Sequence, residues 1–464
     1  MTESGYYAVY NNSDFLIYDL NAMPAELDLL SIACPQFEAY CKDALAEYHR
    51  AHPHQEIDVK QTGAMSAEDF FRDFHAQSAP DIMGVENMET LGILIDKGYC
   101  ADLSANSEIA AAMDRVSPLL SGTVYRGERC YAIPYYAAFS PQIPGYQPEA
   151  MLQLGMGEAE LPSTWSEFFD FVEKWAFDPA LEENGIALIR QPFTLYGIRE
   201  TILLSIAEQQ IALCEQAGAS ITFDTPTVRG LLTRLDELSD TLDALEAAYT
   251  AQAEYSESEP PALLILDYTP IVGDGDKAMN ANCVMLPLRI EQDTAMLFPV
   301  HQGFLVINAG SEHIDDALRL FELILAHMNQ RTKVLLFPDQ RAPMEGPQYQ
   351  NNLAEYRERE KAAEQQIQSC TDPGEQKALQ DRWAFDKQEW LFSLENRYEI
   401  TPESIAVLES MDSRMVPSLG YHFFRQQNSS INHFYQQYLQ RTLSANQLID
   451  SIERILQMQR LEQQ

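Results

Sequence analysis

From the run LLSIA onward, the sequence alternates between short apolar runs and amphipathic segments with helical spacing. LLSIA is apolar almost throughout, which is typical of a strand buried on both faces of a sheet. The next segment places Cys41, Leu45 and Tyr48 on one stripe and predicts a helix that ends at the His52-Pro53 step. EIDVKQ and DIMGV then predict two more strands, separated by the predicted helix AEDFFRDFHA. Such alternation builds a mostly parallel α/β sheet, in which ligands bind beyond the carboxyl ends of the strands.

Length and charge restrict the kinds of partner. A chain of 464 residues predicts two or three compact units. Its 70 acidic and 31 basic residues give a formal net charge of -39. This charge repels nucleic-acid phosphates and anionic lipids, so we expect neither nucleic acid nor a membrane surface as a direct partner. No run of 18 or more apolar residues occurs, so we expect no membrane insertion.

The cysteine pattern favours buried thiols over a disulfide framework. The seven cysteines are Cys34, Cys41, Cys100, Cys130, Cys214, Cys283 and Cys370. Their number is odd, none forms a C-x-x-C pair, and most lie in apolar periodic segments, where a free cysteine packs as a small hydrophobic residue. One disulfide remains the alternative.

Residues 1–27 differ from the rest of the chain. GYYAVYNNSDFLIYDL predicts two short aromatic strands joined by a turn, a hairpin that is marginal alone. It is either the end of an upstream β-rich domain or an addition that pairs with this one. No charged stretch followed by an apolar run marks a signal peptide. The protein is therefore either cytoplasmic or exported by a leader that is absent from this stretch.

Residues 346–398 interrupt the alternation with two charged helical segments on either side of Thr371-Asp372-Pro373-Gly374. Their apolar residues follow a near-heptad spacing. The residues on these stripes are Leu353, Tyr356, Ala363, Ile367 and Cys370, and then Leu379, Trp383, Trp390 and Leu394. We expect a solvated helical hairpin, with a partner-binding arm as the alternative.

Ordered motifs along the chain resemble those of one protein family. They are L-x-I-A at Leu30–Ala33, P-D-I at Pro80–Val85, G-x-x-x-D-L-S at Gly98–Ser104, Y-x-I-P-Y at Tyr131–Tyr135, P-x-T-W-x-E-F at Pro162–Phe168, a Gly-aromatic strand at Gly303–Ser311 and M-V-P at Met415–Phe424. In this order they resemble the extracellular solute-binding proteins of ABC importers, in the group typified by maltose-binding protein. The match covers residues 28–345 and 399–464.

The resemblance implies an α/β, two-lobed, periplasmic-binding-protein-like fold of type II. Residues 28–137 plus 299–345 would form the N-lobe, and residues 138–298 plus 346–464 the C-lobe, joined by a hinge. Residues 1–27 would be a β-like extension and 346–398 a helical-hairpin insertion.

The resemblance also implies a function. The protein would capture a small polar solute, above all a carbohydrate or oligosaccharide, in the interlobe cleft and deliver it to an ABC permease. It would be a monomeric lipoprotein outside the membrane, tethered through a segment not present in this chain. The alternative is a ligand-sensing module of a larger cell-surface protein. The sequence has no G-x-S-x-G, H-E-x-x-H, P-loop or Rossmann motif, so we expect neither catalysis nor a cofactor.

Candidate solute-binding residues follow the predicted strand ends. They are Gln36, Glu86, Asn87, Tyr135, Tyr136, Tyr268, His301, Gln302, Tyr421 and His422. Aromatic rings can stack on sugar rings, and the polar groups can hydrogen-bond to hydroxyls. Alternatively, many of these tyrosines pack the hinge.

Two further motifs could hold metals, and we expect neither to do so. HRAHPHQE brings His49, His52, His54 and Glu56 close together, but a surface turn is the simpler interpretation. GDGDKAMN resembles the start of a calcium loop, with Asp274, Asp276 and Asn280. The later positions that an EF-hand requires are occupied by Ala278, Met279 and Met285, so an acidic loop is expected.

Overall fold

The structure is a computed structural model, and part of the chain is described by it. The described residues are 6–11, 14–19, 28–35, 37–53, 55–62, 65, 67–139, 143–190, 197–254, 260–268, 283–346, 348–395, 397–418, 423–424 and 430–462. Of the residues singled out above, Gln36, His54, Tyr421 and His422 lie outside this set, as does the acidic loop that begins at Asp274.

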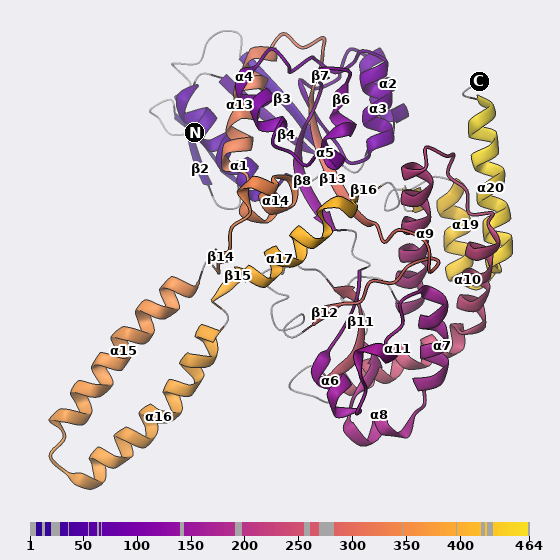
Figure 1. Cartoon of the computed structure of the whole chain (residues 1–464). Coiled ribbons are helices and arrows are strands. Elements are labelled where there is room, and N and C mark those ends of the chain that lie inside the picture. The colour runs from indigo at the N-terminus through magenta and orange to yellow at the C-terminus, as the bar shows by residue number, and fades with distance from the viewer. Residues whose placement is uncertain are drawn as a thin grey trace. The chain divides into compact units, whose positions relative to one another are not determined.

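The chain divides into two compact units. Unit 1 comprises Met1–Ala137 and Gln302–Thr332, and unit 2 comprises Ala138–His301 and Lys333–Gln464. The chain therefore passes between the units after Ala137, His301 and Thr332. Each unit combines early and late segments, as the indigo and orange elements of unit 1 show (Figure 1).

Unit 1 contains the predicted α/β alternation. In spatial order its sheet contains β13 (Phe298–Ile307), β5 (Ile82–Val85), β3 (Asp28–Cys34) and β4 (Gln55–Gln61), and β8 (Ile133–Phe139) also pairs with β13. The helices and turns are α1 (Ala39–Ala51), α2 (Ala67–His75), α3 (Met88–Asp96), α4 (Ser107–Met113), α5 (Pro118–Ser121), η1 (Gly122–Val124) and α13 (Ile314–His327). β3 runs parallel to β4 and β5, whereas β13 runs antiparallel to β5. Leu30, Ile32 and Cys34 are buried, as LLSIA predicts.

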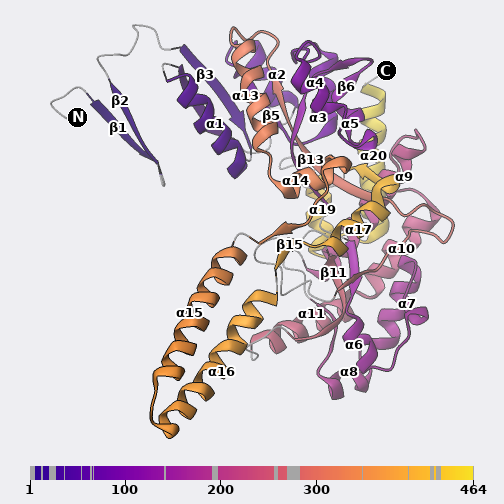
Figure 2. The same cartoon turned by 60° about the vertical axis from the view of Figure 1, so that its left-hand side comes forward.

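Two hairpins also belong to unit 1. β6 (Tyr125–Arg126) and β7 (Arg129–Cys130) form a hairpin, and Gly127 has a φ of 61° in its turn. β1 (Tyr6–Asn11) and β2 (Asp14–Asp19) pair antiparallel, with Val9 opposite Leu16 (Figure 2).

Unit 2 has a smaller sheet covered by many helices. Its spatial strand order is β10 (Ala187–Ile189), β11 (Ala262–Tyr268), β9 (Ile143–Tyr146) and β12 (Val284–Met285). The helices and turns are α6 (Pro148–Gln153), η2 (Glu158–Glu160), α7 (Trp165–Trp175), α8 (Pro179–Asn184), α9 (Ile198–Gln216), α10 (Pro226–Glu237), α11 (Ser239–Glu254), η3 (Pro338–Gln340), α17 (Pro402–Met411), η4 (Asp412–Arg414), α19 (Ser430–Leu439) and α20 (Ala445–Glu462). α14 (Gln330–Leu336) leads from unit 1 into unit 2. The first part of β13, Phe298–Val300, pairs in parallel with β16 (Met415–Pro417).

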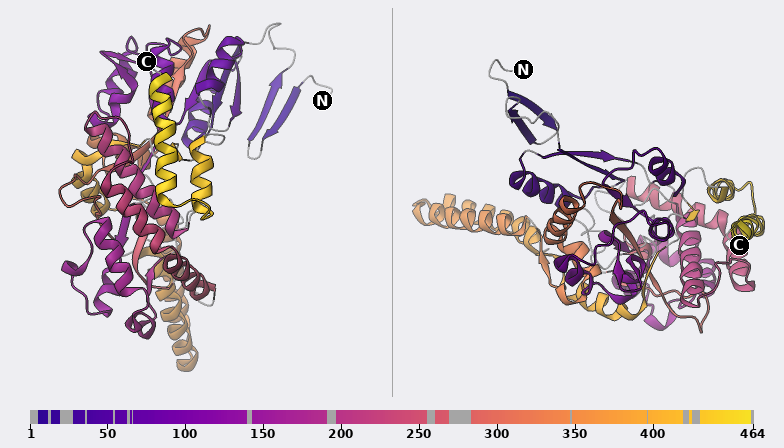
Figure 3. Two further views of the ribbon diagram at one scale, coloured as in Figure 1. Left: turned by 90° about the vertical axis from the view of Figure 1, so that its right-hand side faces the viewer. Right: turned by 90° about the horizontal axis from the view of Figure 1, so that it is seen from above.

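Helix packing forms the core of unit 2. α9 is buried along nearly its whole length, and α19 and α20 lie side by side (Figure 3). Thr164 caps α7 by accepting a hydrogen bond from Glu167 N. The Glu167 carboxylate in turn accepts from Ser163 N at 2.8 Å.

Residues 346–398 form two long helices. β14 (Met344–Glu345) pairs with β15 (Tyr398–Ile400) at their base, and α15 (Tyr349–Ser369) packs along α16 (Pro373–Glu395) (Figures 1 and 2). Tyr356 stacks on Trp383 with ring centroids 6.2 Å apart. The Lys387 ammonium lies 2.9 Å from the Glu360 carboxylate.

All seven cysteines are free thiols, and those other than Cys283 and Cys370 are buried. A buried free thiol packs as a small hydrophobic side chain. Among the described helices, none combines the length and the apolar character that a membrane span needs.

Candidate functional site

Strand ends bring several of the predicted residues to one edge of the unit 1 sheet. Because β3 and β5 are parallel, their carboxyl ends meet at this edge, where Cys34 ends β3 and Glu86 follows β5. Phe304 of β13 lies opposite Val85 of β5, so the next residues along the two strands are Gly303 and Glu86. Glu86 and the neighbouring Gln302 therefore lie at this carboxyl edge.

Tyr135 fills the core behind that edge. Its side chain is 1% exposed, and its ring covers Gly303, where an added Cβ would lie 2.9 Å from the ring carbon Cε1. Burial and the nearby Cys34 thiol, to which its hydroxyl hydrogen-bonds, raise the pKa of Tyr135 far above its usual value. The Tyr40 hydroxyl donates to the Tyr135 carbonyl oxygen. Tyr136, the next residue, is only half-buried.

The adjacent residues Glu86 and Asn87 at this edge differ in their hydrogen bonds. The Asn87 side-chain oxygen accepts a 2.6 Å hydrogen bond from Thr90 N and caps α3. The Glu86 carboxylate is half-buried and has no hydrogen bond or ion pair within the described part of the chain. Burial raises its pKa.

Gln302 is a buried amide without a partner. Its side chain is 3% exposed, and neither Oε1 nor Nε2 has a hydrogen-bond partner among the described residues. Leaving such a group unpaired costs about 1–3 kcal/mol. The Gln302 amide is therefore a candidate for hydrogen bonding to water or to a bound solute.

The predicted residues of unit 2 lie on β11 and β13. Tyr268 ends β11, pairs with Ile143 of β9 across a register shift, and is 7% exposed. Burial, with the nearby Cys283 thiol, raises the pKa of Tyr268 to about 12. His301 is half-buried and follows Val300, which pairs with Pro417 of β16.

A polar hollow in unit 2 contains residues that the sequence reasoning missed. Ser205, Glu208 and Gln209 of α9 line it, opposite Ile143 and the Met296–Pro299 segment. The three polar side chains are only 3%, 4% and 6% exposed. The hollow offers about 10 Å³ to the centre of a water-sized sphere, about enough for one water molecule.

Helical spacing in the sequence could have identified these three residues. Positions 205, 208 and 209 follow the i, i+3, i+4 rule, so they share one face of a segment that is otherwise mostly apolar. The Ser205 hydroxyl donates to the Thr201 carbonyl oxygen at 2.9 Å, so part of this polar stripe is satisfied within α9 itself.

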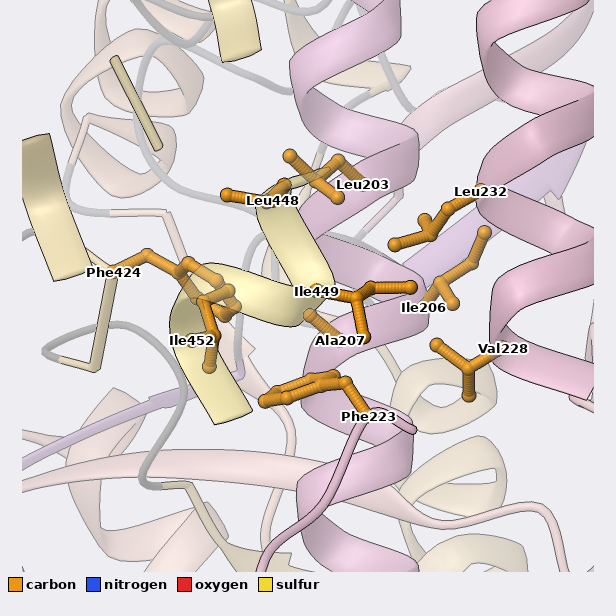
Figure 4. A pocket seen from close by; sticks show the side chains of 10 residues that line it. All are labelled: Leu203, Ile206, Ala207, Phe223, Val228, Leu232, Phe424, Leu448, Ile449 and Ile452. Carbon is orange, nitrogen blue, oxygen red and sulfur yellow. The ribbon is translucent and has the colours of Figure 1, made fainter. Parts of the chain in front are cut away.

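A second hollow is apolar and differs from a solute site. It lies between α9, α10 and α20, and side chains without polar atoms line it (Figure 4). These are Leu203, Ile206, Ala207, Phe223, Val228, Leu232, Phe424, Leu448, Ile449 and Ile452. It has no group that could hydrogen-bond to a polar solute, so it is a packing gap in the helical core.

The histidine-rich turn has ordinary structural contacts. The His52 ring stacks on Tyr48 with centroids 4.6 Å apart. In the described residues, no cluster of three or more His, Cys, Asp or Glu side chains is suited to hold a metal ion.

Comparison with known proteins gives matches in structure only. No protein-family model matches the sequence, and no curated protein matches it. A chitin oligosaccharide binding protein has 13% identity and a TM-score of 0.59, with 93% of this chain and 98% of that chain covered. The ABC substrate-binding protein Lmo0181 from Listeria monocytogenes, in complex with cycloalternan, has 12% identity and a TM-score of 0.54, with coverage of 94% and 99%. Maltose-bound MalE3 of T. maritima has 14% identity and a TM-score of 0.54, with coverage of 93% and 99%.

This chain has the periplasmic-binding-protein-like α/β fold. The α/β, periplasmic-binding-protein-like part of the predicted fold class is thereby confirmed, and the similarity extends over more than nine-tenths of the chain. The solved structures named above are a chitin oligosaccharide binding protein and two proteins in complex with cycloalternan and maltose. These ligands are carbohydrates, the class of solute that the resemblance in sequence motifs implies.

Proposed function

We propose that this protein captures a carbohydrate or oligosaccharide without transforming it and delivers it to an ABC permease. The fold supports this proposal, since the similar structures bind chitin oligosaccharide, cycloalternan and maltose. One observation of this chain carries it: within the described part of the chain, the buried amide of Gln302 has an unpaired donor and an unpaired acceptor. A sugar hydroxyl can both donate and accept, so it can satisfy both atoms of such an amide.

The two units would act as the two lobes. We propose an N-lobe of residues 28–137 plus 299–345 and a C-lobe of residues 138–298 plus 346–464, with 346–398 as an insertion in the C-lobe. These bounds differ from those of the units at residues 299–301 and 333–345, which belong to unit 2. The three passages of the chain between the units would serve as the hinge, and closure would trap the solute.

Each lobe would contribute its own contacts. In unit 1 we assign Glu86, Tyr136 and Gln302 to the solute, with Asn87 and Tyr135 as their support. In unit 2 we assign Tyr268, His301 and the polar residues of α9, which are Ser205, Glu208 and Gln209. Gln36, Tyr421 and His422 remain assignments from the sequence alone.

We place the protein outside the cytoplasmic membrane, as a monomeric lipoprotein tethered through a segment not present in this chain. A second candidate function is a ligand-sensing module of a larger cell-surface protein. The β1–β2 hairpin and the α15–α16 hairpin favour it, because simple solute capture requires neither. Permease genes beside this gene would support import, and a long upstream coding region in the same gene would support sensing.

A thermal-shift screen over sugars, oligosaccharides, amino acids and peptides tests the main proposal. A solute at 100 times its dissociation constant should add about 2.7 kcal/mol to the free energy of unfolding. Chromatography of each hit after long incubation should recover the solute unchanged. A hit confined to peptides or amino acids would refute carbohydrate capture, and a cleaved solute would refute binding without catalysis.

A further inference from the structure

Glu86 is a carboxylate with no ion pair among the described residues. It is half-buried at the carboxyl edge of the unit 1 sheet, and no basic side chain contributes to its shifted pKa, which burial alone raises. Two described basic residues of unit 1 are paired with other acids: Arg126 with Asp96 and Arg129 with Asp102.

The neighbouring side chains of Asn87 and Tyr135 form hydrogen bonds with other groups and not with the Glu86 carboxylate. The Asn87 side-chain oxygen caps α3 through Thr90 N, and the Tyr135 hydroxyl bonds to the Cys34 thiol. None of the ten residues predicted for the site is a lysine or arginine. None of the ion pairs or pKa contributions described for unit 1 therefore gives this carboxylate a basic side chain as its partner.

The energetics of capture indicate what partner this carboxylate needs. Closure of a binding site expels water, and a carboxylate that loses its water without gaining a hydrogen-bonding or charged partner is strongly disfavoured. A cationic group on the solute removes this cost by forming a charged hydrogen bond. Tyr136 follows Tyr135 on β8 and is half-buried, and aromatic faces also attract cations. The net charge of -39 further raises the local concentration of cations.

We infer, on the basis of the proposed function, that the solute is a cationic carbohydrate. It is an oligosaccharide of amino sugars with free, protonated amines, and the Glu86 carboxylate selects it by accepting a hydrogen bond from the ammonium group.

Three β-1,4-linked tetrasaccharides that differ only at carbon 2 test this inference. The glucosamine tetramer carries an ammonium group there, the N-acetylglucosamine tetramer a neutral amide, and cellotetraose a hydroxyl. Calorimetric titration should show that wild-type protein binds the glucosamine tetramer at least about tenfold more tightly than the other two, a difference of about 1.4 kcal/mol. Higher salt should reduce the preference.

Two matched variants assign the preference to one residue. Glu86→Gln keeps the shape of the side chain and removes its charge, so we expect it to bind all three tetramers with similar affinity. Glu89→Gln, on the first turn of α3, removes the same charge nearby and should keep the preference. An unchanged melting temperature without solute shows that each variant is folded.

The outcomes separate this inference from the proposed function. Equal or tighter binding of the neutral tetramers by wild-type protein overturns the cationic solute, as does a tenfold preference that persists in Glu86→Gln. Binding of other neutral sugars, with none of the three tetramers bound, also overturns it while the proposed function stands. If no carbohydrate of any kind binds, both are wrong.

Discussion

Replacement of Gly303 by alanine tests the packing that closes the carboxyl edge of unit 1. The new Cβ would lie 2.9 Å from Cε1 of Tyr135 and 3.1 Å from its Cζ. The ring cannot move away easily, because the Tyr135 side chain is 1% exposed and its hydroxyl hydrogen-bonds to the Cys34 thiol. The backbone of Tyr135 is also held, since its carbonyl oxygen accepts a hydrogen bond from the Tyr40 hydroxyl. Overpacking of this kind costs about 1–3 kcal/mol. The lower backbone entropy of alanine in the unfolded chain returns about 0.4–1 kcal/mol.

The overpacking term outweighs the entropy term, so we expect Gly303→Ala to lower the free energy of unfolding by about 1–2 kcal/mol. Urea denaturation followed by circular dichroism measures this change. Gly310→Ala is the matched control, since its Cβ would meet only Asn308 Oδ1 at 3.5 Å, an ordinary contact. Tyr135→Leu should remove the effect of the alanine in a double-mutant cycle. If Gly303→Ala were as stable as Gly310→Ala, the ring would not pack against this stretch of backbone.

Three further predictions concern other parts of the chain. Burial opposes ionisation of Asp81, but hydrogen bonds, the strongest from Ser31, hold its pKa below the usual value. The ionised Asp81 therefore stabilises the folded protein above pH about 4, and this stabilisation is lost as pH falls through the lower pKa of the folded state. We expect Asp81→Asn to lower the melting temperature at pH 7. The difference in melting temperature between the variant and wild type should shrink toward pH 2. Glu453→Ala leaves Phe223 N without the 2.6 Å hydrogen bond that it donates to the carboxylate, so we expect a loss of about 1–3 kcal/mol and faster amide exchange at that residue. Replacement of residues 349–395 by a short turn should leave the melting temperature of the remaining protein unchanged within about 2 °C, because β14 and β15 still pair. A large drop in melting temperature would show that α15 and α16 stabilise the rest of unit 2.

Much of the fold follows from spacing along the chain. LLSIA, EIDVKQ and DIMGV predict strands in the right places because period and apolar content are local properties. CVMLPL predicts a full strand, yet only Val284–Met285 pairs in the described chain, because strand length depends on the partner β9. The order of the sheet also depends on β13, which pairs with β5 from far along the sequence.

The difference between local spacing and long-range packing also explains the positions of Tyr135 and Tyr136 in unit 1. The sequence places both at a strand end, where period two requires that successive side chains point to opposite faces, but it does not say which face is covered. In the structure Tyr135 turns toward Gly303, which has no side chain and lies more than 160 residues along the chain, and the ring takes that space. Tyr136 therefore points the other way and stays half-buried. Long-range packing, rather than local pattern, thus assigns Tyr135 to the core, whereas contact of Tyr136 with a solute stays a prediction.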